Sequence, residues 1–102
     1  MDFPQADGPH ERVGFVLEGG EVVEVENIHT NPESGFRVSG ENIARYADEA
    51  TATWHTHPGQ SANLSVEDYY TYLNWPMLRH FIIGTDGVAE YYVEDGEVYR
   101  VA

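Results

Sequence analysis

The sequence predicts a mixed α/β (α+β) fold, in which one small mixed β-sheet is flanked by two helices. Short apolar, β-branched runs separated by Gly-containing turns indicate strands along most of the chain. Two other segments carry apolar residues at helical spacing, each behind a serine suited to cap a helix. The 102 residues, 41% of them hydrophobic, suffice for one core, so we expect a single domain over residues 1–102.

A glycine turn separates the first two predicted strands. Val13–Leu17 is apolar almost throughout, which is typical of a buried strand. Gly19 and Gly20 break this run, and Glu21–Asn27 then alternates, with valines at positions 23 and 25. The pattern therefore predicts strand, turn and second strand.

A polar loop, a short strand and a helix are expected next. His29–Gly35 is polar and turn-rich, and Phe36–Val38 is predicted to be a short strand. Ser39 or Gly40 then leads into a predicted helix over Glu41–Asp48. Its apolar residues, at positions 43, 44 and 47, fall at the spacing of one helix face.

A second strand–helix pair follows. Thr51–His57 is β-branched and partly apolar, and Pro58 and Gly59 end it as turn residues do. Ser65 is a suitable N-cap for a helix over Val66–Leu73. We interpret the tyrosines of this helix, at positions 69, 70 and 72, as packing residues, with the lining of a substrate groove as the alternative.

The chain closes with three predicted strands joined by tight turns. Arg79–Gly84 and Val88–Val93 are separated by Asp86–Gly87, a strong hairpin signal. Asp95–Gly96 repeats the signal before Glu97–Val101. No internal repeat or linker divides the chain, which agrees with a single domain.

The residues with the most chemical potential surround the predicted second helix. Residues two apart on a strand point to the same face, so His55 and His57 can aim at one point. Asp68 falls in the first turn of the helix that Ser65 caps, where its carboxylate can meet a cation. Two imidazoles and one carboxylate suit zinc and leave one coordination position open.

Each fragment alone has a simpler explanation. Two histidines flanking a threonine are often a half-buried strand feature, and Ser-x-x-Asp is usually only a helix cap. Their order and the proline after His57 make a catalytic metal site the better interpretation.

The remaining histidines are not assigned to a metal. His10–Gly14 begins like the zincin pattern His-Glu-x-x-His, but glycine stands in place of the second histidine, which excludes that site. His29 lies in a polar loop and is expected to be exposed to solvent. His80, beside Phe81, is expected to be a packed strand histidine.

The run His55-Thr56-His57-Pro58, a short loop and Ser65-x-x-Asp68 resemble the signature of the JAMM (MPN+) zinc metallopeptidases. The resemblance implies a JAMM/cytidine-deaminase-like fold and zinc (Zn2+) as the cofactor. It implies that His55, His57 and Asp68 hold the metal. It also implies that Ser65 stabilises the oxyanion formed during hydrolysis.

The family also places a glutamate upstream of the first core strand, where it acts on the zinc-bound water. Glu11 and Gly14, followed by an apolar strand, are similar to that Glu-x-x-Gly pattern, so the resemblance implies Glu11 as the general base. Glu18 and Glu24 are plausible rivals, and the position before Gly14 favours Glu11. Val13 departs from the pattern, because many relatives carry a cysteine there.

Softer matches point to one branch of the family. Asn27, Asn31–Pro32, Phe36–Ser39 and Trp75–Pro76 resemble the compact JAMM domains of bacteriophage tail-assembly proteins. Phage tail proteins are therefore possible partners. The ten residues before Glu11 leave little room for the N-terminal helix usual in the family.

The resemblance implies hydrolysis of a peptide or isopeptide bond in a peptide or protein substrate. The leading prediction is a zinc metallopeptidase linked to phage tail assembly. A ubiquitin-like-modifier isopeptidase is the second hypothesis. The third is a non-catalytic assembly or interaction module that retains the fold.

The composition argues against several other classes of protein. The formal net charge is −13 and all five basic residues are arginines, so the chain offers no broad surface for nucleic acid. A solvated acidic face explains this charge most simply, with a basic substrate as the alternative. No apolar run approaches the ~20 residues of a membrane span, and Met1–Asp7 lacks the features of a signal peptide. We expect a cytoplasmic protein that binds no membrane, in the host cytoplasm if a phage encodes it.

Overall fold

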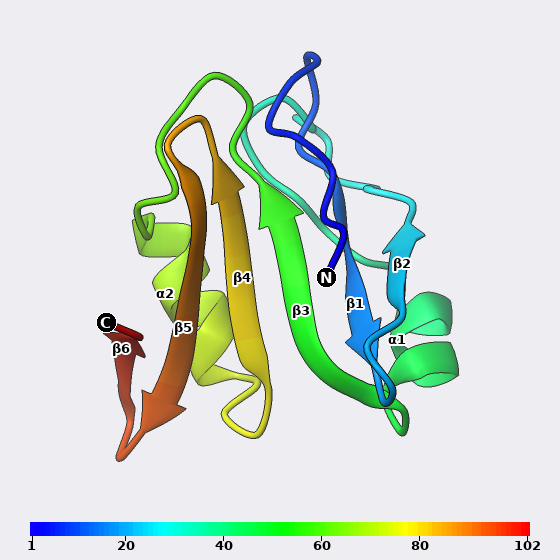
Figure 1. The fold of residues 1–102 in the computed structure, drawn as a ribbon. Coiled ribbons are helices and arrows are strands. Elements are labelled where there is room, and N and C mark those ends of the chain that lie inside the picture. The colour runs from blue at the N-terminus through cyan, green and yellow to red at the C-terminus, as the bar shows by residue number, and fades with distance from the viewer.

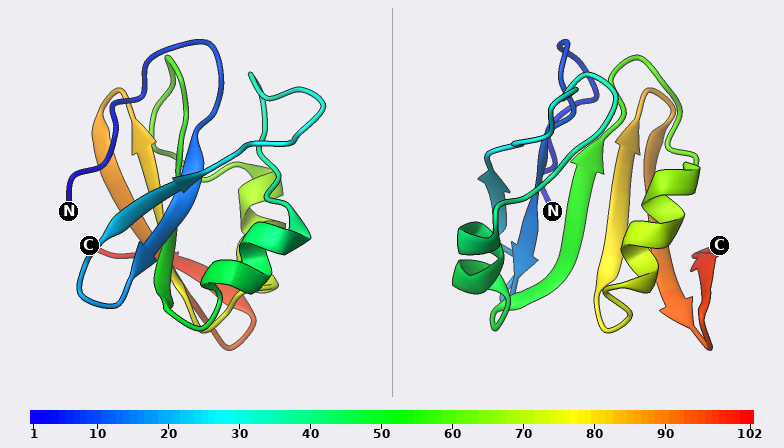
Figure 2. Two further views of the ribbon diagram at one scale, coloured as in Figure 1. Left: turned by 90° about the vertical axis from the view of Figure 1, so that its right-hand side faces the viewer. Right: turned by 180° about the vertical axis from the view of Figure 1, so that it is seen from behind.

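Six strands form one mixed sheet with two helices on one of its faces, which confirms the predicted α+β fold (Figures 1 and 2). The structure is a computed structural model that covers residues 1–102. The strand order is β2-β1-β3-β4-β5-β6. The elements are β1 (Val13–Leu17), β2 (Val22–Val25), α1 (Gly40–Tyr46), β3 (Ala50–Thr56), α2 (Val66–Leu73), β4 (Arg79–Gly84), β5 (Gly87–Glu94) and β6 (Glu97–Arg100).

One predicted strand is wrong. Phe36–Val38 is a loop, whereas the bounds of the other predicted elements agree with the structure to within two residues. Arg37 donates its backbone N–H to the side chain of Asn27, at 3.0 Å, and accepts one hydrogen bond from the N–H of Ile28, at 2.9 Å. A side chain thus replaces the ladder of backbone bonds that a strand at this position would need.

Only one pair of neighbouring strands is parallel. β3 and β4 run side by side in the same direction, and α2 is the connection between them. Their carboxyl ends therefore meet at the same edge of the sheet (Figure 1). β1 is antiparallel to β3, so the beginning of β1 lies at this edge too. Ligand sites in sheets with parallel strands commonly form at such an edge.

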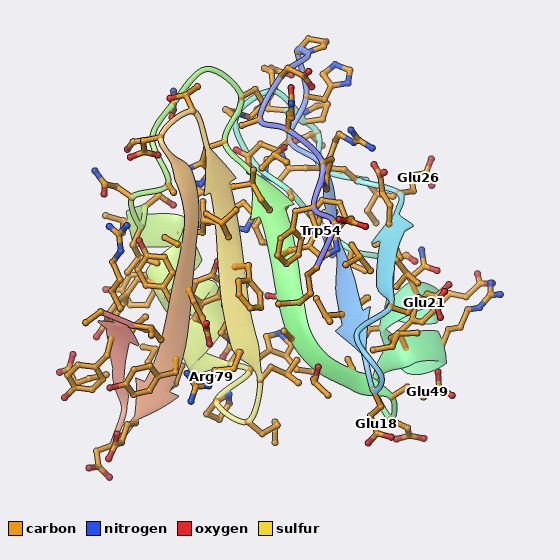
Figure 3. The ribbon with its side chains drawn as sticks, in the orientation of Figure 1. Glu18, Glu21, Glu26, Glu49, Trp54 and Arg79 are labelled. Atoms are coloured by element: carbon orange, nitrogen blue, oxygen red, sulfur yellow. The ribbon has the colours of Figure 1, made fainter.

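The N-terminal segment covers part of the face opposite the helices. Trp54 is 1% exposed and packs with Phe81 and with Phe3 of that segment, on the side shown in Figure 3. Its indole N–H donates to the carbonyl of Val23 at 3.1 Å. A Cβ on Gly14 would lie 1.9 Å from that carbonyl and 2.7 Å from the indole, so only glycine fits beneath Trp54.

Acidic side chains project from the β1–β2 edge of the sheet and from its lower end. Glu18, Glu21, Glu26 and Glu49 gather there in Figure 3, consistent with the predicted acidic surface. No helix in the fold has the length and apolar character required to cross a bilayer. Glu18 and Glu49 lie at the end of the sheet opposite the carboxyl ends of β3 and β4, where the candidate site forms.

Candidate metal centre

Strand pairing brings Glu11 beside the two histidines. Val13 pairs with His55 across the antiparallel β1–β3 ladder. The pairing continues past the strand ends, because the N–H of Thr56 donates to the carbonyl of Arg12 at 2.9 Å. Glu11 therefore lies opposite His57. Alternation along both strands places the side chains of Glu11, His55 and His57 on the face that the helices cover.

The two imidazoles and one carboxylate form a tight triangle. The Nε2 atoms of His55 and His57 lie 3.1 Å apart. Asp68 reaches both, with Oδ1 at 3.2 Å from Nε2 of His55 and Oδ2 at 3.1 Å from Nε2 of His57. Ligand atoms about 2.0–2.1 Å from a tetrahedral zinc ion lie roughly 3.3 Å apart. The separations and the donor types therefore fit a bound metal ion, and the three residues are 1%, 8% and 4% exposed.

A backbone carbonyl sets the tautomer of His57. The carbonyl of Ser61 lies 2.9 Å from Nδ1 of His57, and a carbonyl can only accept, so Nδ1 carries the proton. Nε2 faces Asp68 and His55, and in the neutral imidazole it is the nitrogen left without a proton, as a metal ligand requires. Gly84 allows this approach, because a Cβ there would lie 2.2 Å from the backbone N of Ala62.

His55 is oriented by Tyr72, a residue that the sequence pattern does not distinguish from a packing residue. The Tyr72 hydroxyl lies 3.4 Å from Nδ1 of His55. If Nδ1 donates to that hydroxyl, Nε2 is free to face the metal position. The Tyr72 ring stacks on His80 with centroids 3.9 Å apart, and the Phe36 ring lies 4.4 Å from that of His55.

The packed histidine His80 supports Tyr72 through the ring stack. Its Nε2 lies 3.1 Å from the carbonyl of Trp75, so Nε2 carries the proton. Its Nδ1 then accepts from the Thr53 hydroxyl at 2.7 Å. His80 is 0% exposed, which confirms that it is a packed strand histidine.

Asp68 and Ser65 form a capping box at the start of α2. The Asp68 N–H donates to Ser65 Oγ at 3.1 Å, and the Ser65 N–H donates to Asp68 Oδ2 at 3.3 Å. This arrangement fixes the carboxylate toward the histidines. Because Ser65 Oγ only accepts in this box, its hydroxyl hydrogen remains available to donate. Ser65 is exposed and lines the same small polar cavity as Glu11 and His57.

The electrostatics of the triangle favour an ionised Asp68 and a neutral His55, whereas His57 holds a proton more readily than usual. Burial raises the pKa of Asp68, but hydrogen bonds from His55 and His57 outweigh it and hold the pKa well below its usual range. Burial lowers the pKa of His55. Burial also opposes protonation of His57, but the hydrogen bonds to Asp68 and to the Ser61 carbonyl outweigh it and raise the pKa. The negative charge of Asp68 that favours a proton at Nε2 of His57 also attracts a metal cation.

Glu11 lies beside the triangle without joining its direct contacts. Its ligand atom and those of His55 and His57 all lie within 4.8 Å of one another, so these residues could also hold a metal. Asp68 is nearer, at 3.1–3.2 Å. Burial raises the pKa of Glu11 from 4.5 to about 7, which suits a group that accepts and returns a proton near neutral pH.

A side-chain hub holds the backbone around Glu11. The Asn27 amide nitrogen donates to the carbonyls of Glu11, at 2.8 Å, and Gly35, at 3.0 Å. Its oxygen accepts from the N–H groups of His29, at 3.1 Å, and Arg37, at 3.0 Å. Asn27 therefore ties the backbone of Glu11 to the loop that carries Phe36.

The rival sites of the sequence analysis lie elsewhere. Glu24 forms an exposed ion pair with Arg12 at 2.6 Å, and Glu18 is also exposed. The predicted exposure of His29 is wrong, because the residue is half-buried and its ring packs against Gly35 in the loop. The prediction that Tyr70 is a packing residue is also wrong, because Tyr70 is 63% exposed.

The comparisons with known proteins inform the fold alone. No family model and no curated protein matches the chain. The chain is similar to the solution structure of protein DSY2949 from Desulfitobacterium hafniense, with a TM-score of 0.70 and 19% identity. The similarity covers 91% of this chain and 76% of that one, so nearly the whole α+β fold has a counterpart in that structure.

Proposed function

We propose that the chain is a zinc-dependent metallopeptidase of the JAMM type. The observation that supports this function best is the triangle of His55, His57 and Asp68, with Glu11 placed beside it. The donor set of two imidazole nitrogens and one carboxylate is a common catalytic zinc set. The adjoining polar cavity, of about 100 Å³, gives a substrate access to these groups.

The roles of the residues follow from their positions. His55, His57 and Asp68 would hold the ion, which when bound acidifies a water and polarises a carbonyl oxygen. Glu11 would accept the proton of the attacking water and return it to the leaving amine. Ser65 would donate its free hydroxyl hydrogen to the oxyanion, and one such donor typically contributes about a hundredfold or more in rate.

Glu11→Gln tests this function with the fold preserved. We expect the variant to bind zinc as the wild type does and to lose at least about a hundredfold in cleavage, because the amide cannot accept the proton. The measurement is peptide cleavage over a degenerate library, read by mass spectrometry. Glu18→Gln is the matched control, because that carboxylate is exposed and distant from the triangle. Equal cleavage by wild type and Glu11→Gln would contradict the proposal.

The substrate class remains a prediction. A library that contains both linear and lysine-branched peptides separates peptide from isopeptide hydrolysis. Cleavage of branched peptides alone would favour the modifier isopeptidase. No zinc binding and no cleavage would favour the non-catalytic module. The link to phage tail proteins and the cytoplasmic location rest on the sequence alone.

A further inference from the structure

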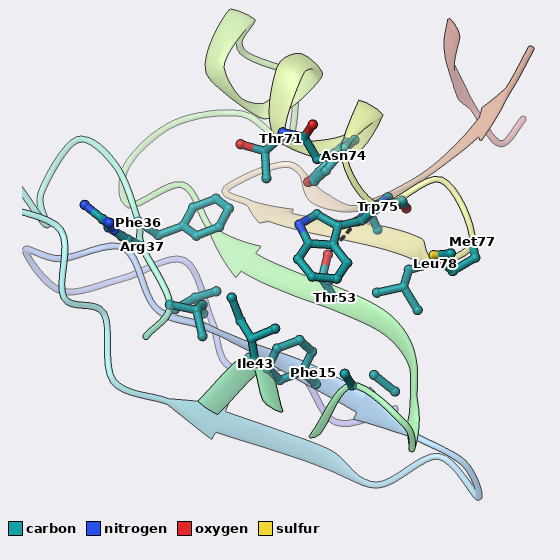
Figure 4. Close-up of a pocket in the computed structure, with 17 residues that line it drawn as sticks. Phe15, Phe36, Arg37, Ile43, Thr53, Thr71, Asn74, Trp75, Met77 and Leu78 are labelled. Atoms are coloured by element: carbon teal, nitrogen blue, oxygen red, sulfur yellow. Dashed lines mark hydrogen bonds between the residues drawn. The ribbon is translucent and has the colours of Figure 1, made fainter. Parts of the chain in front are cut away.

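A large apolar cavity lies between the two helices, next to the candidate metal centre (Figure 4). Its volume is about 640 Å³, within the range of small-molecule pockets. Phe15 and Thr53 form its floor on β1 and β3, Ile43 contributes from α1, and Trp75 and Leu78 contribute from the segment after α2. We refer to it as the interhelical groove.

The groove adjoins the polar cavity of the metal centre. Phe36 and Thr71 line both. The Phe36 ring also lies 4.4 Å from the ring of His55. A chemical group bound at the Phe36 end of the groove therefore lies beside a group held at the metal centre.

The chain itself does not cover this apolar surface. Helix α1 has no buried residue, although its Ile43 and its C-cap residue Ala47 line the groove. Met77, at the far end, is 80% exposed. Apolar surface left in contact with water is unfavourable, and an apolar ligand gains affinity by covering it.

Polar groups on the wall of the groove have unused hydrogen-bonding capacity. The Trp75 indole N–H and the Thr71 hydroxyl make no hydrogen bond within the protein. Every buried side-chain polar atom in the structure does have a hydrogen-bond partner. These two groups are therefore open to solvent. A mostly apolar cavity with a few free polar groups is typical of a specific ligand site.

We propose that the interhelical groove binds a large apolar side chain of the peptide substrate, at a residue next to the scissile bond. This inference rests on the proposed peptidase function, because it places the substrate chain across the metal centre. Phe36 and Thr71 then form the boundary between the reacting bond and the bound side chain. The net charge of −13 disfavours acidic residues in the peptide beside the bound side chain.

Direct binding tests the groove without requiring activity. The probes are N-acetyl-phenylalaninamide and N-acetyl-asparaginamide, titrated into metal-free protein and followed by amide NMR. We expect the phenylalanine probe to shift signals of Thr53, Thr71 and Trp75 and to bind at least about tenfold more tightly than the asparagine probe. Equal binding of both probes, or shifts confined to other residues, would overturn the proposal.

Two substitutions, one at the C-cap of α1 and one within the helix, form a matched pair. Ala47, the C-cap, is exposed and lines the groove, so Ala47→Trp fills it without disturbing the core. Ala44 is exposed within α1 and does not line the groove, so Ala44→Trp controls for the added indole. We expect Ala47→Trp to weaken the phenylalanine probe at least tenfold and Ala44→Trp to leave it unchanged. Equal effects of the two variants would overturn the assignment. It would also be overturned if the NMR signals of the groove shifted with protein concentration in the absence of probe, because a second copy of the chain would then occupy the groove.

Cleavage separates this proposal from the proposed function. With peptides that carry phenylalanine or leucine at the flanking residue, Ala47→Trp should raise KM at least tenfold, and with glycine peptides it should not. If the probe binds the groove but no peptide is cleaved, the peptidase function fails and the apolar site stands. If peptides are cleaved with equal KM by both α1 variants, the groove assignment fails and the peptidase function stands.

Discussion

Tyr72→Phe should weaken metal binding without breaking the fold. The substitution removes only the hydroxyl that lies 3.4 Å from Nδ1 of His55. The ring and its stack on His80 remain, with centroids 3.9 Å apart in the wild type. The variant therefore isolates the hydrogen bond that orients His55, one of the proposed metal ligands.

The size of the effect follows from the burial of His55, which is 1% exposed. Metal at Nε2 forces the proton onto Nδ1, where the variant offers no acceptor. A buried donor without a partner costs about 1–3 kcal/mol. The bond is long, so the lower end applies, about 1–1.5 kcal/mol or roughly a tenfold loss of zinc affinity. Metal-free His55 avoids this cost by moving its proton to Nε2, which faces Asp68 at 3.2 Å.

The assay is competition for zinc with a chromophoric chelator at pH 7, together with urea unfolding in EDTA. Tyr46→Phe is the control, because Tyr46 packs on Phe15 and contacts neither histidine. We expect the control to bind zinc like the wild type. An affinity of Tyr72→Phe within twofold of the control would refute the positioning of His55 by Tyr72.

Three further variants test how the surroundings hold the site. Gly84→Ala should cost about 1–3 kcal/mol of unfolding free energy and weaken zinc binding, because its Cβ would meet the backbone at Ala62 and displace the carbonyl that holds His57; zinc binding at wild-type affinity would argue against this link. Asn27→Ala should cost about 2–4 kcal/mol in urea unfolding, since four backbone groups lose a partner; a cost below about 1 kcal/mol would contradict the hub. Burial lowers the pKa of His80 from 6.5 to about 4, so the unfolded chain binds the proton first and stability falls as the pH drops from 6.5 to 4. In EDTA, the unfolding free energy of the wild type should fall by about 3 kcal/mol more over this pH range than that of His80→Gln. Equal decreases would show that His80 is not buried in the neutral form.

Local patterns in the sequence sufficed to predict the three residues of the triangle. The period of two along a strand predicts that His55 and His57 share a face, and the cap spacing predicts Asp68 in the first turn of α2. Both relations span a few residues and depend on backbone geometry alone. The structure places all three side chains together.

The remaining parts depend on contacts between distant residues. Glu11 reaches the site through the pairing of Val13 with His55, a register that no local pattern reveals, and only the family resemblance suggested it. The Ser61 carbonyl that orients His57 is a backbone group and carries no signal in the sequence.

The wrong strand at Phe36–Val38 has a similar origin. Its extended, apolar character is a real preference, but a strand also needs a partner edge. Here the side chain of Asn27 satisfies the backbone instead. The interhelical groove likewise follows from how far apart α1 and α2 lie on the sheet, which depends on tertiary packing rather than on either helix alone.

The most direct test of the metal centre is the crystal structure of the zinc-soaked protein, with anomalous scattering recorded at the zinc edge. We predict one ion per chain, bound by Nε2 of His55, Nε2 of His57 and a carboxylate oxygen of Asp68, with Glu11 outside bonding distance. The absence of an ion from this triangle, or an ion bound by Glu11 in place of Asp68, would contradict the account.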